Sequence, residues 1–122
     1  MAKTKESKLE EEIERFMSKR GIWQLARYQA QSNQNGLPDR LYLYKGFLLG
    51  LELKTDEGKP TKLQLKKLDA INKNGGIGLI VRNVETVMQL IKLIDFYENE
   101  DREIDQYYIL KHIKEWMEEN GY

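Results

Sequence analysis

The sequence has 122 residues, 40% hydrophobic and 33% charged, a size and balance that fit one globular domain. Its 20 basic and 20 acidic side chains cancel, which argues against a protein that coats DNA through charge alone. The absence of cysteine excludes disulfides and thiolate metal sites, and no apolar run approaches the ~20 residues that span a membrane. The charged first residues lack the apolar core of a secretory signal, so we expect a cytoplasmic protein without a membrane partner.

The first predicted element is a helix over residues 7–20. Ser7 and Glu10 have the spacing of a capping box, and Gly21 stands where a helix stop is expected. Glu10 lies at the margin of the apolar face of this helix. The apolar face itself consists of Leu9, Ile13, Phe16 and Met17.

Three strands are expected next. Residues 22–28 form the first, and the polar, Gln/Asn-rich residues that follow form a loop. Residues 39–44 and 47–54 then form a hairpin around a tight turn at 45–46. On the second hairpin strand Glu52 and Lys54 share one face, because alternate side chains of a strand point the same way. The opposite face is wholly apolar: Phe47, Leu49, Leu51 and Leu53.

The second half of the chain alternates helices with one strand. A helix is expected over residues 61–74, followed by a buried strand over residues 77–82. Asn83 can cap the next helix, and residues 106–120 have the pattern of a last amphipathic helix. The order α-β-β-β-α-β-α-α predicts an α/β fold in which helices flank a mixed sheet. We expect one domain over residues 1–122, with a core over about 7–97 and a helical extension over about 105–122 that serves as an appendage or an interface.

Four polar residues of the hairpin and the next helix can form a metal-dependent site: Asp39, Glu52, Lys54 and Gln64. Antiparallel pairing could bring Asp39 close to Glu52, and two converging carboxylates suit Mg²⁺ or Mn²⁺. The backbone carbonyl of Leu53 could complete the coordination. Lys54 would orient a water molecule or stabilise the charge that develops on a phosphorane. This is a coherent design for phosphodiester hydrolysis.

Each residue also has a plainer interpretation. Glu52 and Lys54 could be a solvated pair on a half-exposed strand, and Asp39 could be a turn residue. Gln64 completes a capping box with Thr61, so it could serve only the helix terminus. However, Gln64 also falls within the core-facing stripe, where a buried amide needs a polar partner.

In their order and spacing, these residues resemble the virus-type replication-repair nuclease (VRR-Nuc) domain of the PD-(D/E)XK nuclease superfamily, whose common core is αβββαβ. That family's pattern is G-x-P-D, a glycine, E-x-K and then G-K-P-(S/T)-x-x-Q. The resemblance covers roughly residues 7–95. The segments that match are Gly36-Leu37-Pro38-Asp39, Gly46, Glu52-Leu53-Lys54, Gly58-Lys59-Pro60-Thr61 and Gln64.

The resemblance implies a role for each matched residue. Asp39 and Glu52 would bind Mg²⁺, with Mn²⁺ as a substitute, Lys54 would be catalytic, and Gln64 would support the site. The family also has a glutamate on the first helix. We place it at Glu10, and the alternatives are Glu11 and Glu14.

The resemblance further implies a DNA endonuclease that acts on structured or branched DNA such as Holliday junctions, in a bacterial or phage-infected cell. Symmetric cleavage of a junction needs two active sites, which favours a C2 homodimer. Lys59, Lys62 and Arg40 are candidate contacts to DNA, although Arg40 could simply be solvated at the surface. The alternatives are a nickase or restriction-like nuclease acting on ordinary duplex, and a non-catalytic module that binds nucleic acid.

Overall fold

A computed structural model of the chain describes residues 4–28, 36–99 and 105–122. The predicted loop after the first strand and most of the acidic stretch before the last helix lie outside these residues. The elements are α1 (Lys5–Lys19), β1 (Trp23–Arg27), β2 (Arg40–Tyr44), β3 (Phe47–Leu53), α2 (Lys62–Lys73), β4 (Ile77–Val81), α3 (Val84–Asn99) and α4 (Gln106–Glu119).

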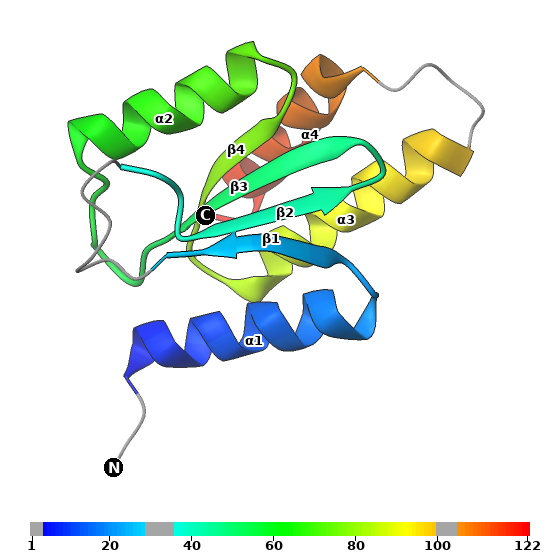
Figure 1. Cartoon of the computed structure of the whole chain (residues 1–122). Helices are drawn as coiled ribbons and strands as arrows, with labels where there is room; N and C mark the ends of the chain where they lie inside the picture. Colours follow the sequence, from blue (N-terminus) through cyan, green and yellow to red (C-terminus); the bar gives the residue numbers. More distant parts are fainter. Residues whose placement is uncertain (1–3, 29–35, 100–104) are drawn as a thin grey trace.

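The four strands form one mixed sheet in the order β1-β2-β3-β4. The pairs β1–β2 and β2–β3 are antiparallel, whereas β4 runs parallel to β3 because α2 carries the chain back between them. Helix α2 lies along one side of the sheet and α1 along the other, with α3 and α4 behind the strands (Figure 1). The predicted α/β class and element order are therefore confirmed.

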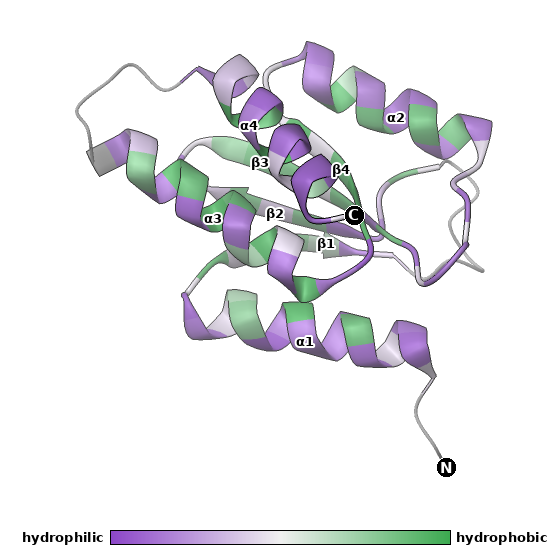
Figure 2. Ribbon diagram, turned by 180° about the vertical axis from the view of Figure 1, so that it is seen from behind, coloured by the Kyte–Doolittle hydropathy of each residue, from purple (hydrophilic) through white to green (hydrophobic). Residues whose placement is uncertain are grey.

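The core lies between the apolar face of β3 and the helices behind it. Leu49, Leu51 and Leu53 are at most 2% exposed, as the alternation along this strand predicts. Hydrophobic and hydrophilic residues alternate along α1 and α3 in the manner of amphipathic helices (Figure 2). None of the described helices combines the length and the hydrophobicity of a membrane span.

Helix α4 packs into the same core. Its residues Ile109 and Ile113 are fully buried. The side-chain Nε2 of Gln106 donates to the carbonyl oxygens of Asn72 and Gly76, at 2.6 and 2.8 Å, and so ties the start of α4 to the end of α2. Trp116 and Met117, on the helical extension that could serve as an interface, are half-buried and pack against this core.

Helix α1 begins earlier than predicted. Thr4 caps it, and its hydroxyl oxygen accepts a hydrogen bond from the Ser7 N–H at 3.1 Å. The predicted capping box of Ser7 and Glu10 is therefore wrong, because Ser7 already lies within the first turn. The predicted cap of α3 is confirmed, since Asn83 Oδ1 accepts from the Thr86 N–H at 2.8 Å.

Glycines let α2 approach the sheet closely. A Cβ atom at Gly78 would lie 2.8 Å from the Leu68 carbonyl oxygen, a backbone atom that cannot rotate away. We therefore expect Gly78→Ala to push α2 away from β4 and to lower the free energy of unfolding by roughly 1–3 kcal/mol. Urea denaturation checks this. An unchanged midpoint would show that α2 can move without cost.

Candidate active site

The hairpin places the two acidic residues at the same level of the sheet. Lys45 and Gly46 form a two-residue turn in which both have positive φ, 48° and 86°. This turn sets a register in which Arg40 pairs with Leu51. Asp39, one residue before Arg40, therefore stands beside β3 near its carboxyl end, where Glu52 lies.

Asp39 is fixed by the neighbouring strand. Its side chain is only 5% exposed, and its Oδ2 accepts a hydrogen bond from the Leu53 N–H at 2.9 Å. A turn residue in solvent would not be buried or bridge two strands in this way. The structure thus favours the interpretation of Asp39 as part of a site.

Glu52 is almost completely buried, at 1% exposure. Its Oε1 accepts a hydrogen bond from Gln64 Nε2 at 3.0 Å. Its Oε2 has no hydrogen-bond partner among the residues that the structure describes. A buried carboxylate oxygen without a donor is costly, and such an atom calls for an explanation.

The electrostatics of Glu52 reflect this burial. Burial is the main cause, and the neighbouring Asp39 carboxyl the second, of a rise in the pKa of the Glu52 carboxyl from its ordinary 4.5 to about 8. The Lys54 ammonium lowers this pKa, and the carboxylate of Glu6 on α1 raises it. Once both Asp39 and Glu52 are ionised they are acceptors only, so a cation is the natural partner for the pair.

Gln64 serves two functions at once. Its Oε1 accepts from the Thr61 N–H at 2.8 Å, and the Thr61 hydroxyl oxygen accepts from the Gln64 N–H at 3.1 Å, which completes a capping box at the start of α2. The side-chain nitrogen of Gln64, Nε2, takes no part in this cap and donates to Glu52. The two interpretations of Gln64 are therefore compatible: the cap fixes the side chain that orients the Glu52 carboxylate.

Lys54 follows the end of β3 and is half-buried. Its N–H donates to the Val81 carbonyl oxygen at 3.0 Å, which holds this residue against β4. Its ammonium lowers the pKa of the Glu52 carboxyl, so the two side chains interact electrostatically. The solvated surface pair considered for Glu52 and Lys54 does not describe this geometry, because Glu52 is buried.

The first helix presents several glutamates, and they face different partners. Glu10 Oε2 lies 3.5 Å and Glu14 Oε1 3.0 Å from the Nη2 atom of Arg40, so both pair with a buried guanidinium. The charge of Glu6, also on α1, raises the pKa of Glu52. Glu6 was missed because the predicted helix began at Ser7. Its position one helical turn before Glu10 is the signal that could have identified it.

The expectation that Arg40 contacts DNA is wrong. Arg40 is 1% exposed and faces the α1 side of the sheet, as its register partner Leu51 does. By contrast, Lys59 and Lys62 are exposed beside the start of α2 and remain available to phosphates.

The donor set fits a hard divalent cation. Asp39 and Glu52 offer carboxylate oxygens, and Mg²⁺ commonly binds one or two carboxylates while it keeps water and substrate phosphate oxygens as further ligands. The Leu53 carbonyl is the additional donor expected from the sequence. The described residues contain no cluster of three or more His, Cys, Asp or Glu side chains that could hold a metal. A cluster of that kind would coordinate a metal with protein ligands alone. Mg²⁺ does not require this, because water and substrate phosphate complete its coordination.

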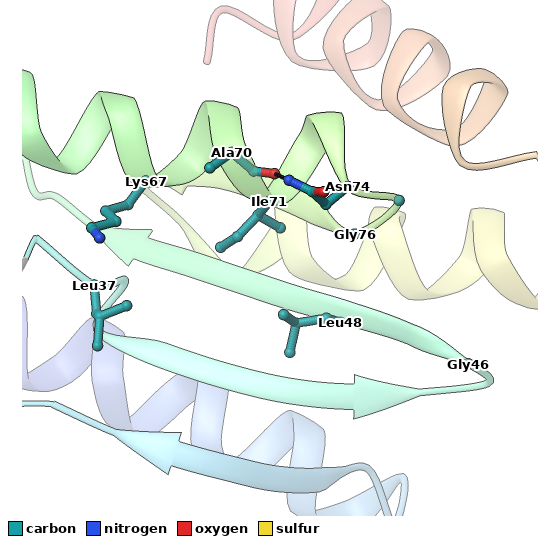
Figure 3. A pocket seen from close by; sticks show the side chains of 9 residues that line it. Leu37, Gly46, Leu48, Lys67, Ala70, Ile71, Asn74 and Gly76 are labelled. Carbon is teal, nitrogen blue, oxygen red and sulfur yellow. Dashed lines mark hydrogen bonds between the residues drawn. The ribbon is translucent and has the colours of Figure 1, made fainter.

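A separate pocket lies between α2 and the hairpin. Leu37, Leu48 and Ile71 give it an apolar wall, and Lys67 is the one ionisable residue that lines it in the described part of the chain (Figure 3). Among the described residues, neither Asp39 nor any other carboxylate lines it. This pocket therefore lacks the chemistry of the site at the strand ends.

Comparison with known proteins supports the fold. No model of a protein family matches the sequence, and no curated protein does. A solved structure described as "VRR_NUC domain" is similar, with a TM-score of 0.61 and 23% sequence identity over 74% of this chain and 97% of that chain. The chain shares with that structure an α/β core in which helices flank a mixed four-stranded sheet. More narrowly, it has the fold of a VRR-Nuc domain.

Proposed function

We propose that this protein is a Mg²⁺-dependent DNA endonuclease that hydrolyses phosphodiester bonds. One observation carries the proposal: Glu52 Oε2 is buried beside the Asp39 carboxyl and has no donor among the described residues. A bound divalent cation would satisfy this atom and remove the repulsion between the two carboxylates. Mn²⁺, which prefers similar ligands, is expected to substitute.

Each residue of the site has a definable part in hydrolysis. Asp39 and Glu52 hold the cation, together with the carbonyl of Leu53. A bound divalent cation would supply the activation of water and the neutralisation of charge on the phosphoryl oxygens. Lys54 orients the attacking water or stabilises the negative charge that develops in the transition state. Gln64 holds the Glu52 carboxylate in its binding orientation.

The proposed first-helix glutamate of the site is Glu6 rather than Glu10. The Glu10 carboxylate pairs with Arg40, whereas the charge of Glu6 acts directly on Glu52. Glu6 is exposed, so it can reach a water or a phosphate at the rim of the site.

Branched DNA is the proposed substrate class, since the VRR-Nuc resemblance implies structured DNA and Holliday junctions in particular. Lys59 and Lys62 would contact its phosphates. Cleavage of both strands of a junction would use two copies of the chain in a C2 homodimer.

A panel of labelled DNAs tests this proposal. We expect Mg²⁺-dependent cleavage of a four-way junction at least about 10-fold faster than that of linear duplex, with none in EDTA. Equal rates on both would favour the restriction-like or nickase alternative. Binding without cleavage of any DNA in Mg²⁺ or Mn²⁺ would favour the non-catalytic module and overturn the enzyme. Light scattering of the same sample reports whether the chain is a dimer.

A further inference from the structure

Arg40 is a charged residue in the interior that the proposed chemistry does not use. Its guanidinium is 1% exposed, and its Nε has no partner among the described residues. A buried, incompletely paired charge is weak evidence for stability, because apolar residues of similar volume often fill such a place at no loss. The contacts of Arg40 therefore indicate a role other than stability.

The Arg40 guanidinium links α1 to the backbone of Asp39, one of the two candidate metal ligands. Nη1 donates to the Asp39 carbonyl oxygen at 3.0 Å, and Nη2 donates to Glu14 at 3.0 Å with Glu10 close by. The same Asp39 carbonyl also accepts from the Tyr28 N–H at 2.9 Å. The Asp39 peptide is thus held by Arg40 and Tyr28, while its side chain is held by β3.

The two glutamates also set the rotation of α1. Glu6, Glu10 and Glu14 are spaced by four residues, so they lie along one face of the helix. When Arg40 holds Glu10 and Glu14, it turns the same face, and with it Glu6, toward the carboxylate site. One buried guanidinium therefore fixes two parts of that site that are distant in sequence.

We propose that Arg40 is a positioning residue: it aligns Asp39 and the glutamate face of α1 for cation binding and does not itself contact metal or DNA. The inference rests on the proposed metal-dependent function. Removal of a residue that orients a metal ligand typically lowers the metal affinity by about 10–100-fold.

The test compares Arg40→Met with Arg27→Met. Arg27 also approaches Glu14, at 3.6 Å, but it is half-exposed, and the structure gives it no contact with the Asp39 carbonyl. Titration calorimetry of Mn²⁺ into the full chain without DNA is the first measurement. We expect Arg40→Met to weaken Mn²⁺ binding by at least about 10-fold and Arg27→Met by less than about 2-fold.

Two further readouts separate positioning from folding. The Mn²⁺ concentration needed for half-maximal cleavage should rise in Arg40→Met, while junction affinity measured in Ca²⁺ should stay within about 2-fold. If Arg40→Met does not fold, Arg40→Lys and Glu14→Gln replace it. Each retains side-chain volume and is expected to weaken Mn²⁺ binding by about 3-fold or more, since each loses part of the paired geometry.

The outcomes distinguish the inference from the proposed function. If wild type binds Mn²⁺ and the folded Arg40 and Glu14 variants bind it equally well, the positioning role is overturned and the nuclease proposal stands. If wild type neither binds Mn²⁺ nor cleaves DNA, both are overturned. If Arg27→Met weakens binding as much as Arg40→Met, the effect belongs to α1 packing and the specific role of Arg40 is overturned.

Discussion

Asp39→Asn is expected to abolish DNA cleavage, with kcat reduced by at least about 1000-fold, while the protein remains folded. An asparagine side-chain oxygen can still accept the hydrogen bond from the Leu53 N–H, so the link between the strands survives. What is lost is one of the two negative charges that would bind Mg²⁺. Single-turnover cleavage of the junction substrate with saturating protein measures the effect.

The matched control for this variant is Asp69→Asn. Asp69 is an exposed aspartate on α2 that pairs with Lys73 at 2.9 Å, away from the carboxylate site. Its replacement removes the same charge and should leave cleavage within about 2-fold, because exposed ion pairs of this type contribute little. Substantial cleavage by Asp39→Asn would show that this residue is not a metal ligand.

The hairpin was predictable because its signals are local. Strand alternation assigns Glu52 and the leucines of β3 to opposite faces, and a Lys-Gly turn between apolar runs sets the register. Once the register is known, the approach of Asp39 to Glu52 follows without any tertiary information. The predicted capping box of Thr61 with Gln64 is equally local, and the structure confirms it.

The partners of α1 depend on tertiary packing and were not predictable. Periodicity identifies the buried face of a helix, but it does not say which part of the sheet that face meets. Glu10 was therefore placed at the metal site, whereas it pairs with Arg40. Arg40 was assigned to DNA because arginines in strands are usually exposed, and the compensating glutamates lie 26 and 30 residues earlier in the chain.

The sequence pattern predicts helix α4 but does not predict what the helix packs against. Its amphipathic pattern predicts a helix with one apolar face, and the structure confirms the helix. The pattern does not reveal that Ile109 and Ile113 fill the shared core, because a helix that packs on its own domain and one that packs on a partner have the same periodicity. The bonds from Gln106 to the end of α2 are specific to the folded chain.

The stability of the metal-free protein is expected to fall as the pH rises from about 5 to about 8. The pKa of Glu52 is 4.5 in its ordinary state and about 8 in the folded protein, through burial and the proximity of Asp39. Between these values the folded chain holds a proton that the unfolded chain has released. The stabilising contribution is therefore complete below about pH 4.5 and is lost as the pH rises through about 8.

Glu52→Gln should remove this dependence, because a glutamine stays neutral and its oxygen still accepts from Gln64. At pH 9 the variant should be more stable than metal-free wild type by up to about 5 kcal/mol. Thermal melts from pH 5 to 9 measure this, with Glu57→Gln, an exposed carboxylate in the β3–α2 loop, as the control. A wild-type melting temperature that does not change over this range would contradict the burial argument.

Addition of Mg²⁺ should stabilise wild type more than Glu52→Gln, whereas without metal Glu52→Gln is the more stable of the two. At pH 8 to 9 the cation should raise the melting temperature of wild type, because it binds the folded state and pairs with the carboxylates. It should have little effect on Glu52→Gln, which lacks one of the two charges. The substitution that stabilises the metal-free protein is thus the one that removes the response to metal. If Mg²⁺ raised both melting temperatures equally, its site would lie elsewhere.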